Sequence, residues 1–222
     1  MRTRELRKAY ELMRQRFGHQ GWWPGETPFE ICVGAVLTQN TAWTNVEKAI
    51  VNLKRARVLT PRRMFALAES ELAELIRPAG YFNVKARRLR AFLRVIVEEC
   101  GGRLANLMGG ETHRVRERLL AINGIGPETA DSMLLYAADH HSFVIDAYTK
   151  RIFARHGWCE ESTAYHELQE RCVDALGQKR GEEQLDYWRD YHAQLVMVGK
   201  EHCRPREPRC ETCPLKSLLP GD

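Results

Sequence analysis

Two carboxylates eighteen residues apart, Glu128 and Asp146, have surroundings that suit chemistry. Glu128 closely follows a turn that contains Gly124 and Gly126, and Asp146 follows the apolar run 143–145. A carboxylate can stabilise a developing positive charge and can orient or deprotonate a water molecule. Asp is also a good helix N-cap, and a capping carboxylate can still face a cleft, so both roles are open to Asp146.

Two helices must hold the glycine turn. Residues 111–122 carry apolar side chains at helical spacing, and a second helix with an apolar face begins after Gly126. Pro127 suits the first position of that helix, because its missing N–H would have no partner there. Glycine lets the turn approach a ligand closely, and the N–H groups that open the second helix can bind an anion such as a DNA phosphate. A plain turn between two helices is the alternative interpretation.

The rest of the sequence predicts an all-α protein. The apolar helix 29–37 ends in the polar segment 38–43, which contains Gln39 and Asn40 and suits a DNA-facing loop better than a core. Further helices are predicted over Thr3–Phe17, 45–59, 61–67, 70–76 with Ser70 as N-cap, 147–156 ended by Gly157, Tyr165–Leu176 and 184–198.

Composition and charge fit a protein that meets phosphates. The 222 residues carry a formal net charge of +5, a mildly basic balance that many other proteins share. No apolar run approaches the roughly 18 residues of a membrane span, and the N-terminus lacks the apolar core of a signal peptide. Seven cysteines, an odd number, favour thiols and metal ligation over a disulfide framework. We expect a monomeric protein of the cytoplasm, associated with the nucleoid and not with membranes.

Two motifs carry a family resemblance. Leu-x-x-Ile-x-Gly-Ile-Gly-x-x-Thr-Ala at 119–130 and Val-Ile-Asp-x-Tyr-x-x-Arg at 144–151 resemble the helix-hairpin-helix DNA glycosylases of the endonuclease III type. The similarity covers nearly the whole chain. It implies excision of damaged or mispaired bases from double-stranded DNA, in base excision repair. It also implies an all-α, two-lobed fold: a helical barrel lobe with the hairpin at 20–135, and a second lobe from 1–19 plus 136–222.

The resemblance assigns roles to particular residues. Asp146 would be the catalytic carboxylate, while Gln39 and Tyr81 would fill the space left by a flipped base. Tyr81 could equally make an ordinary core contact. The implied DNA-binding surface further contains Asn40, Asn83, Lys85, Gly124, Gly126 and Thr129. We also expect that the hairpin could hold a monovalent cation.

Glu128 stands where bifunctional members of the family place a lysine. That lysine forms a Schiff base with the sugar, and a carboxylate cannot replace an amine in this chemistry. The sequence therefore predicts a monofunctional glycosylase without a β-lyase step. Glu128 itself could act directly, or it could only complement the dipole of its helix.

The expected substrate is an alkylated purine such as 3-methyladenine. A cationic base leaves as a neutral molecule without an added proton, and aromatic faces bind such a cation. Trp22 and Trp23, followed by Pro24, and Trp43 would form the base pocket, although the adjacent tryptophans could instead fill the core. These residues and the segment 34–43 resemble the 3-methyladenine branch of the family. Oxidised or mismatched bases are the alternative substrates, and a catalytically lapsed DNA-binding protein is the non-enzymatic alternative.

Three cysteines near the end of the chain, Cys203, Cys210 and Cys213, form a loop at 203–213 with metal-site spacing. The family's loop reads Cys-x6-Cys-x2-Cys-x5-Cys and holds a 4Fe–4S cluster, but the fourth position here is Leu219. The loop could hold a cluster with a fourth ligand from elsewhere, zinc with His202 as the fourth ligand, or no metal. The remaining cysteines offered as that ligand are Cys32, Cys100, Cys159 and Cys172.

Overall fold

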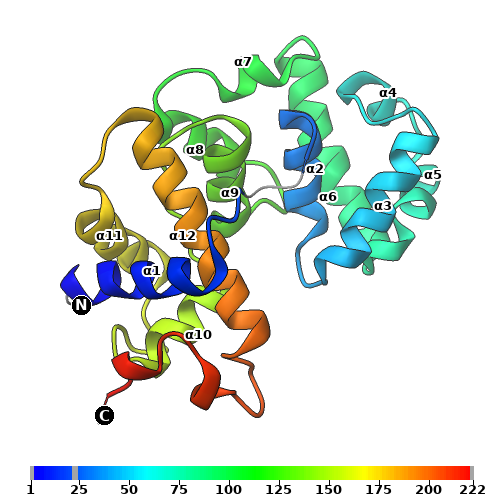
Figure 1. Ribbon diagram of the computed structural model, residues 1–222. Coiled ribbons are helices and arrows are strands. Elements are labelled where there is room, and N and C mark those ends of the chain that lie inside the picture. The colour runs from blue at the N-terminus through cyan, green and yellow to red at the C-terminus, as the bar shows by residue number, and fades with distance from the viewer. Residues whose placement is uncertain (1–2, 22–24, 221–222) are drawn as a thin grey trace. The chain divides into compact units, whose positions relative to one another are not determined.

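The computed structural model describes residues 3–21 and 25–220, and within these ranges the chain forms helices and loops but no strand (Figure 1). The all-α prediction is therefore confirmed. The chain divides into two compact units, unit 1 with Met1–Trp22 and Phe143–Asp222, and unit 2 with Trp23–Ser142. The expected boundary at 135 differs from the observed division at Ser142, because the helix that contains residue 135 packs within unit 2.

Unit 2 is built around α2 (Pro28–Leu37), which packs against α9, α6 and α3. Nearly every residue of α2 is buried, as expected for a helix that is apolar on all sides. Thr27 caps it, and the Thr27 side chain accepts the N–H of Glu30 at 3.1 Å. The other helices of unit 2 are α3 (Trp43–Arg55), α4 (Pro61–Phe65), α5 (Glu69–Leu75), η1 (Arg77–Ala79), α6 (Phe82–Arg94), η2 (Val95–Glu99), α7 (Leu104–Met108), α8 (Thr112–Leu120) and α9 (Pro127–Ala137).

The start of α5 corrects one sequence prediction. Its N-cap is Ala68 and not Ser70, so the helix begins at Glu69. The carboxylate of Glu71 reaches back and accepts the N–H of Ala68 at 2.7 Å. A Glu at the third helical position supplies the partner that the cap residue lacks.

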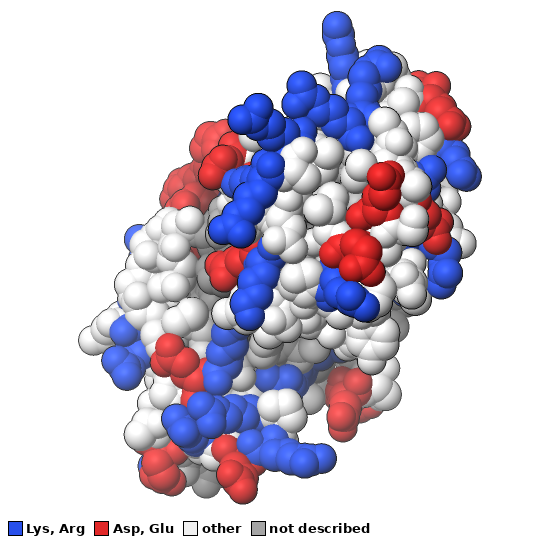
Figure 2. Space-filling model, turned by 90° about the vertical axis from the view of Figure 1, so that its right-hand side faces the viewer, with Lys and Arg blue, Asp and Glu red and all other residues white. Residues whose placement is uncertain are grey.

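Cationic side chains are numerous on the surface. Figure 2 shows Lys and Arg spread over the displayed face, with Asp and Glu in smaller groups among them. This distribution agrees with the net charge of +5 and favours an anionic partner.

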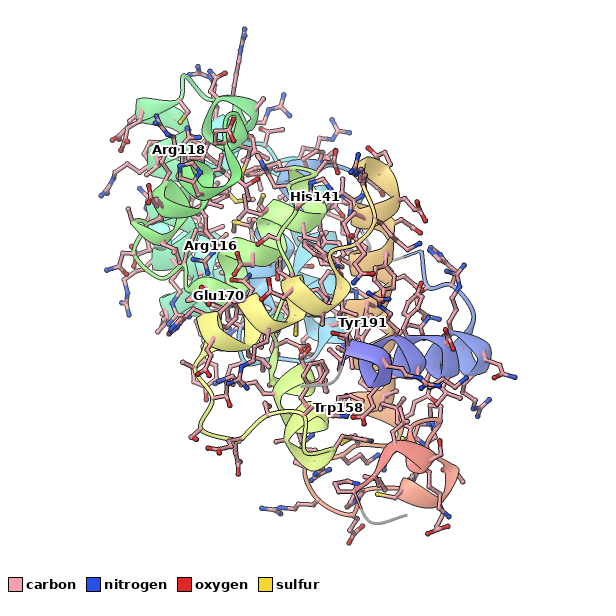
Figure 3. The ribbon with its side chains drawn as sticks, turned by 90° about the vertical axis from the view of Figure 1, so that its left-hand side faces the viewer. Arg116, Arg118, His141, Trp158, Glu170 and Tyr191 are labelled. Carbon is pink, nitrogen blue, oxygen red and sulfur yellow. The ribbon has the colours of Figure 1, made fainter. Side chains whose placement is uncertain are left out.

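The helices α8 and α9 are locked together by a buried carboxylate. Asp131 on α9 is fully buried and binds Arg116 of α8 through two hydrogen bonds, of 2.7 and 3.0 Å. The Ser142 hydroxyl donates a third hydrogen bond to Asp131, at 2.7 Å. Arg116 is labelled in Figure 3. Paired, charge-assisted hydrogen bonds of this kind fix the geometry of both partners, so the two helices hold the turn between them firmly.

Unit 1 joins the N-terminal helix to the C-terminal ones. Tyr191, which is labelled in Figure 3, stacks on Tyr10 with ring centroids 5.5 Å apart. Its hydroxyl donates to the carbonyl of Leu6 at 2.9 Å. These contacts hold α1 (Thr3–Phe17) against α12 (Gly181–Glu201). The other helices of unit 1 are α10 (Ala147–Arg155), α11 (Tyr165–Leu176), η3 (Cys210–Thr212) and η4 (Lys216–Leu218).

A glycine brings α10 and α12 close together. A Cβ atom at Gly199 of α12 would lie 2.2 Å from the ring of Tyr148 on α10, closer than two carbon atoms that are not bonded to each other can approach. The close packing places the start of α10 beside the C-terminal half of α12. None of the helices in the described ranges is long and apolar enough to cross a membrane.

Candidate active site and cysteine loop

The hairpin turn between α8 and α9 requires glycine at its first position. Gly124 has φ +88°, a left-handed conformation that glycine adopts without strain. A Cβ atom there would also lie 2.2 Å from Cγ of Arg88, whose side chain crosses the turn. Between the glycines, Ile125 is buried, and its N–H donates to the carbonyl of Ile122 at 3.0 Å. The turn is therefore anchored by one apolar side chain while its backbone lies at the surface.

The first turn of α9 has no side-chain cap. Its N-cap residue is Gly126, and Pro127 occupies the start of the helix, as predicted. Glu128 is exposed in this first turn. The N–H groups of an uncapped helix start can bind an anion from outside the protein.

Gln39 lies on the hairpin. Its amide nitrogen donates to the carbonyl of Gly124 at 3.0 Å and to the hydroxyl of Thr129 at 2.9 Å, and its amide oxygen accepts a hydrogen bond from Arg88. Thr129 is itself buried, while Asn40 is exposed and has φ 59°. Sequence reasoning missed Arg88. Its role at the turn depends on a tertiary contact that sequence spacing does not reveal.

Tyr81 projects from unit 2. It is 68% exposed and has the left-handed backbone conformation φ 46°, at the N-cap of α6. The alternative that Tyr81 makes an ordinary core contact is therefore wrong. Asn83 is exposed two residues further on.

Lys85 differs from the expectation that it contacts DNA. Its side chain is 1% exposed, and its ammonium group donates to the carbonyls of Leu37 at 2.8 Å and Ala79 at 2.7 Å. Burial, together with the charge of Arg88, lowers the pKa of Lys85 to about 8. Lys85 therefore ties the end of α2 to η1. These two hydrogen bonds hold the backbone just before Gln39 and just before Tyr81. The ammonium group of Lys85 does not reach the surface of the protein.

The predicted base pocket is only partly visible. Trp22, Trp23 and Pro24 lie outside the described residues. Trp43 is half-buried at the start of α3, packs against the core of unit 2, and donates its indole N–H to Glu47 at 2.9 Å.

Asp146 caps α10, as the sequence predicts. Its Oδ1 accepts the N–H of Thr149 at 2.7 Å and the Thr149 hydroxyl at 2.8 Å. Its Oδ2 lies 3.5 Å from Nε2 of His192, on α12. The residue is 8% exposed, so little of it meets solvent.

The surroundings of Asp146 keep it ionised. Burial by itself raises the pKa of this carboxyl, but the contact with His192 and the two hydrogen bonds from Thr149 outweigh burial, and the net pKa lies below its usual value of 3.8. An ionised carboxylate with little hydration can stabilise a cation strongly. Sequence reasoning missed His192. The only local signal was a polar ring in a helix whose neighbouring residues are buried.

The three cysteines of the C-terminal loop line one small cavity, together with Leu219. Cys203 is buried, and its sulfur accepts a hydrogen bond from Arg155 at 3.3 Å. Burial, with a smaller contribution from the two neighbouring cysteines, raises the pKa of Cys213. The three predicted metal ligands therefore line one cavity, but within the described ranges they are not grouped closely enough to hold a single metal ion.

Two arginines of α10 hold the start of the cysteine loop. Arg155 also donates to the carbonyls of Arg204 at 2.6 Å and Pro205 at 3.1 Å. Arg151 donates to the carbonyl of Cys203 at 2.7 Å. The helix that begins at Asp146 therefore ends on the cysteine loop.

None of the cysteines proposed as a fourth ligand lies at this cavity. Cys32 is in the core of unit 2, and Cys172 is fully buried on α11, where it lies near Cys159. Neither these three nor Cys100 is among the residues that line the cavity. The expectation that one of them completes the ligand set is therefore not supported. Within the described ranges, no three His, Cys, Asp or Glu side chains are grouped so as to hold one metal ion.

The glycine hairpin and the capped aspartate that follows it define a class of proteins, the helix-hairpin-helix DNA repair enzymes. Residues 33–178 match the model of the HhH-GPD superfamily of base excision DNA repair proteins. The chain belongs to this family, and it is a DNA glycosylase of base excision repair.

Individual relatives agree with this assignment. The chain is 45% identical, over 95% of its length and 94% of the relative, to a Methanocaldococcus jannaschii protein whose name describes a DNA repair glycosylase. It is 30% identical to endonuclease III of Thermotoga maritima, over 86% of this chain and 81% of that protein. It is also similar to the crystal structure of H. pylori 3-methyladenine DNA glycosylase bound to 1,N6-ethenoadenine, with 30% identity, a TM-score of 0.74, and coverage of 90% of this chain and 97% of that one.

Proposed function

We propose that this protein is a monofunctional DNA N-glycosylase that removes alkylated purines, such as 3-methyladenine, from double-stranded DNA. The observation that carries the proposal is the combination of an ionised, nearly enclosed Asp146 with a carboxylate, Glu128, at the first turn of α9. The likeness to the H. pylori 3-methyladenine DNA glycosylase supports the choice of substrate. The site of action would be the nucleoid, in the cytoplasm.

The first step is extrusion of the damaged nucleotide, because its glycosidic bond lies inside the duplex. The hairpin backbone at Gly124 and Gly126 and the uncapped start of α9 would grip a phosphate beside the lesion. The exposed ring of Tyr81 would enter the base stack. For Gln39 to enter the gap, it must leave its hydrogen bonds with Gly124 and Thr129.

Asp146 would act on the sugar. When the C1′–N bond breaks, the bonding electron pair leaves with the base and the sugar becomes an oxocarbenium-like cation. The carboxylate of Asp146 would stabilise that cation and orient the water whose oxygen adds to C1′, while the water proton passes to the carboxylate or to solvent. His192 and Thr149 would hold the carboxylate ionised for this role.

The chemistry of the leaving base explains the preference for alkylated purines. A neutral adenine needs an acid to protonate it, and Ala35 occupies the place where the adenine-mismatch branch has a glutamate. An N-alkylated purine is already cationic and leaves as a neutral molecule. Aromatic side chains bind cations of this type, and Trp43, with Trp22 and Trp23, would supply them.

We also propose that the C-terminal loop holds a 4Fe–4S cluster on Cys203, Cys210 and Cys213. The cavity that these cysteines share, and the Arg155 hydrogen bond to the sulfur of Cys203, fit thiolate ligands. Such a cluster would serve a structural role, by fixing the loop against the end of α10. The arginines of the loop could then contact phosphates.

The substrate is tested by single-turnover excision assays on matched duplexes. These contain 3-methyladenine or 7-methylguanine, an oxidised pyrimidine, or a mismatch, and the control enzyme is Asp146→Asn. We expect release from the alkylated duplexes only, and no release by the variant. Release of oxidised or mismatched bases with none from alkylated duplexes contradicts the substrate proposal.

The monofunctional proposal needs its own test. Borohydride reduction during turnover traps a Schiff base between enzyme and sugar, and we expect no trapped adduct and no strand cleavage. A lysine-dependent adduct contradicts the proposal, because it requires an amine nucleophile.

The second candidate is a glycosylase for oxidised or mismatched bases. The 30% identity with a protein named endonuclease III favours it, and the same assays distinguish it from the first. If the protein binds abasic-site DNA but releases no base from any duplex, it is a catalytically lapsed binding protein instead.

A further inference from the structure

His202 lines the same cavity as the three loop cysteines, and the surroundings of its ring nitrogen Nε2 indicate that this nitrogen could bind a ligand. The residue is 5% exposed, and within the described ranges Nε2 has no hydrogen-bond partner. The nearest carboxylate oxygen, on Glu201, is 3.8 Å away, which is beyond hydrogen-bond distance. A buried polar nitrogen without a partner costs free energy, so its retention in this cavity calls for an explanation.

The other ring nitrogen is positioned to leave Nε2 available. Nδ1 of His202 lies 3.3 Å from the hydroxyl oxygen of Thr212 in the same loop. In the tautomer that carries its proton on Nδ1, the ring donates to Thr212 and keeps the lone pair of Nε2 free. Histidine ligands of metal centres are oriented in this way, by a hydrogen bond from the ring nitrogen that does not bind the metal.

The backbone around His202 is held firmly. Its N–H donates to the carbonyl of Val198 at 2.9 Å, and its own carbonyl accepts the N–H groups of Arg204 and Arg209, each at 2.9 Å. The ring of Phe17 of α1 lies beside the imidazole, with ring centroids 6.1 Å apart, and His202 is 5% exposed. The ring is therefore fixed at the end of α12 and shielded from solvent.

A second histidine at the cavity makes a useful contrast. His156 also lines it, but its Nδ1 lies 2.8 Å from the carbonyl oxygen of Ile152 and its Nε2 lies 3.3 Å from that of Leu215. Both nitrogens of His156 therefore face backbone oxygens. Of the two rings, only that of His202 has a nitrogen available for a metal.

We propose that Nε2 of His202 is the fourth protein ligand of the cluster, in place of the cysteine that Leu219 replaces. This inference rests on the proposed cluster. Adjacent residues such as His202 and Cys203 converge poorly on one ion, but a cluster spreads its ligands over four iron atoms, so the two residues can bind different irons. Leu219 lines the same cavity and cannot ligate iron.

The test uses the full-length protein, purified without oxygen, with measurement of iron and acid-labile sulfide. We expect about four of each per chain. Pulsed electron paramagnetic resonance of the reduced cluster should show coupling to a coordinated nitrogen, and ¹⁵N-histidine labelling should change that coupling. His202→Ala should abolish the coupling and lower iron retention about tenfold or more.

Two variants separate ligation from a structural role. His156→Gln should keep the nitrogen coupling, because His156 is held by backbone oxygens. Leu219→Cys combined with His202→Ala should regain iron without nitrogen coupling. Its reduction potential should be lower than that of the natural protein, because histidine ligands raise cluster potentials relative to cysteine.

The outcomes distinguish this inference from the proposals on which it depends. A brown protein without nitrogen coupling, or one whose coupling survives His202→Ala, overturns histidine ligation and leaves the cluster standing. Bound zinc, or no metal after anaerobic purification and reconstitution with iron and sulfide, overturns both. Excision assays on the same preparations report on the glycosylase proposal separately.

Discussion

Two helices that begin twenty residues apart differ in what meets their unpaired first N–H groups. α9 (Pro127–Ala137) starts at Gly126 without a side-chain cap, so its first N–H groups can meet an anion from outside. α10 (Ala147–Arg155) starts at Asp146, whose own carboxylate accepts the N–H of Thr149. The first start suits binding of a phosphate. The second holds a fixed negative charge that suits a cationic sugar.

The difference shows what each start requires from the rest of the protein. The start of α9 follows a glycine turn of adjacent residues, and the side chains of Gln39 and Arg88 pack on that turn. The start of α10 needs α12 as well, because His192 comes from that helix and helps to keep Asp146 ionised. The backbone of the turn before α9 is therefore set by adjacent residues, while the ionisation of Asp146 depends on a residue that is distant in sequence.

Removing the charge of Asp146, at the start of α10, should have the largest effect on base excision. Asp146→Asn should lower single-turnover excision about 10³-fold, because it deletes the carboxylate that we propose to stabilise the developing cation. Asn is as good an N-cap as Asp, so the variant should stay folded and should lose only the stability that the charge of Asp146 adds. Asp146→Ala, which also removes the cap, should cost about 1 kcal/mol of stability. Wild-type excision by Asp146→Asn contradicts the catalytic role.

Altering the glycine turn before α9 should have the next largest effect, on DNA binding and on stability. Gly124→Ala should weaken binding to abasic-site DNA and destabilise unit 2 by about 1–3 kcal/mol, because φ is positive and the new Cβ meets Arg88. Gly126→Ala is the matched control, since φ is −91° and no atom lies within 4 Å of its Cβ position. DNA titration measures the loss of binding in Gly124→Ala, and thermal unfolding compares the stability of the two variants. Equal losses of stability in both variants contradict a turn that specifically needs glycine at 124.

The charge at α10 also predicts a pH dependence of stability. Because the pKa of Asp146 lies below its usual value of 3.8, the ionised carboxylate adds stability that is fully present above about pH 5. That contribution is lost as the pH falls below 3.8 through the lowered pKa. The difference in unfolding free energy between wild type and Asp146→Asn, from denaturant titrations, should therefore be constant near neutrality and shrink in acid. A difference that changes between pH 6 and 8 would point to another group.

Glu128 should matter least. Glu128→Gln removes an exposed charge from the first turn of α9, where acidic residues complement the helix dipole by about 0.3–1 kcal/mol. We expect excision to change by less than about tenfold. A loss as large as that of Asp146→Asn would show that Glu128 acts directly on the substrate.

Local patterns predicted the helices well. α1 and α11 were predicted with the bounds that the structure shows, and Pro127 and Asp146 begin α9 and α10 as expected. Apolar spacing, a proline at the first helical position and an Asp cap act within a few residues, so the sequence displays them directly. The cap of α5 was wrong, because Glu71 replaced the expected Ser70 as the side chain that satisfies the helix start.

Side-chain roles were harder to predict. Lysine is a residue type that often contacts DNA, but the ammonium group of Lys85 lies between two backbone carbonyls inside unit 2. Gln39 was expected to face DNA, and in the structure its amide binds the hairpin and Arg88. A charge or an amide in the sequence does not show whether water or protein atoms surround it.

By itself, the sequence determined the family, the helices, the glycine hairpin, the capping aspartate and the spacing of three cysteines, because all of these are properties of short segments. Only the tertiary structure decided what each polar group meets. It placed His192 beside Asp146, buried Lys85, and brought His202 into the cavity of the cysteines. The protonation and reactivity of a side chain depend on burial and on its neighbours, and those come from segments that are distant in sequence.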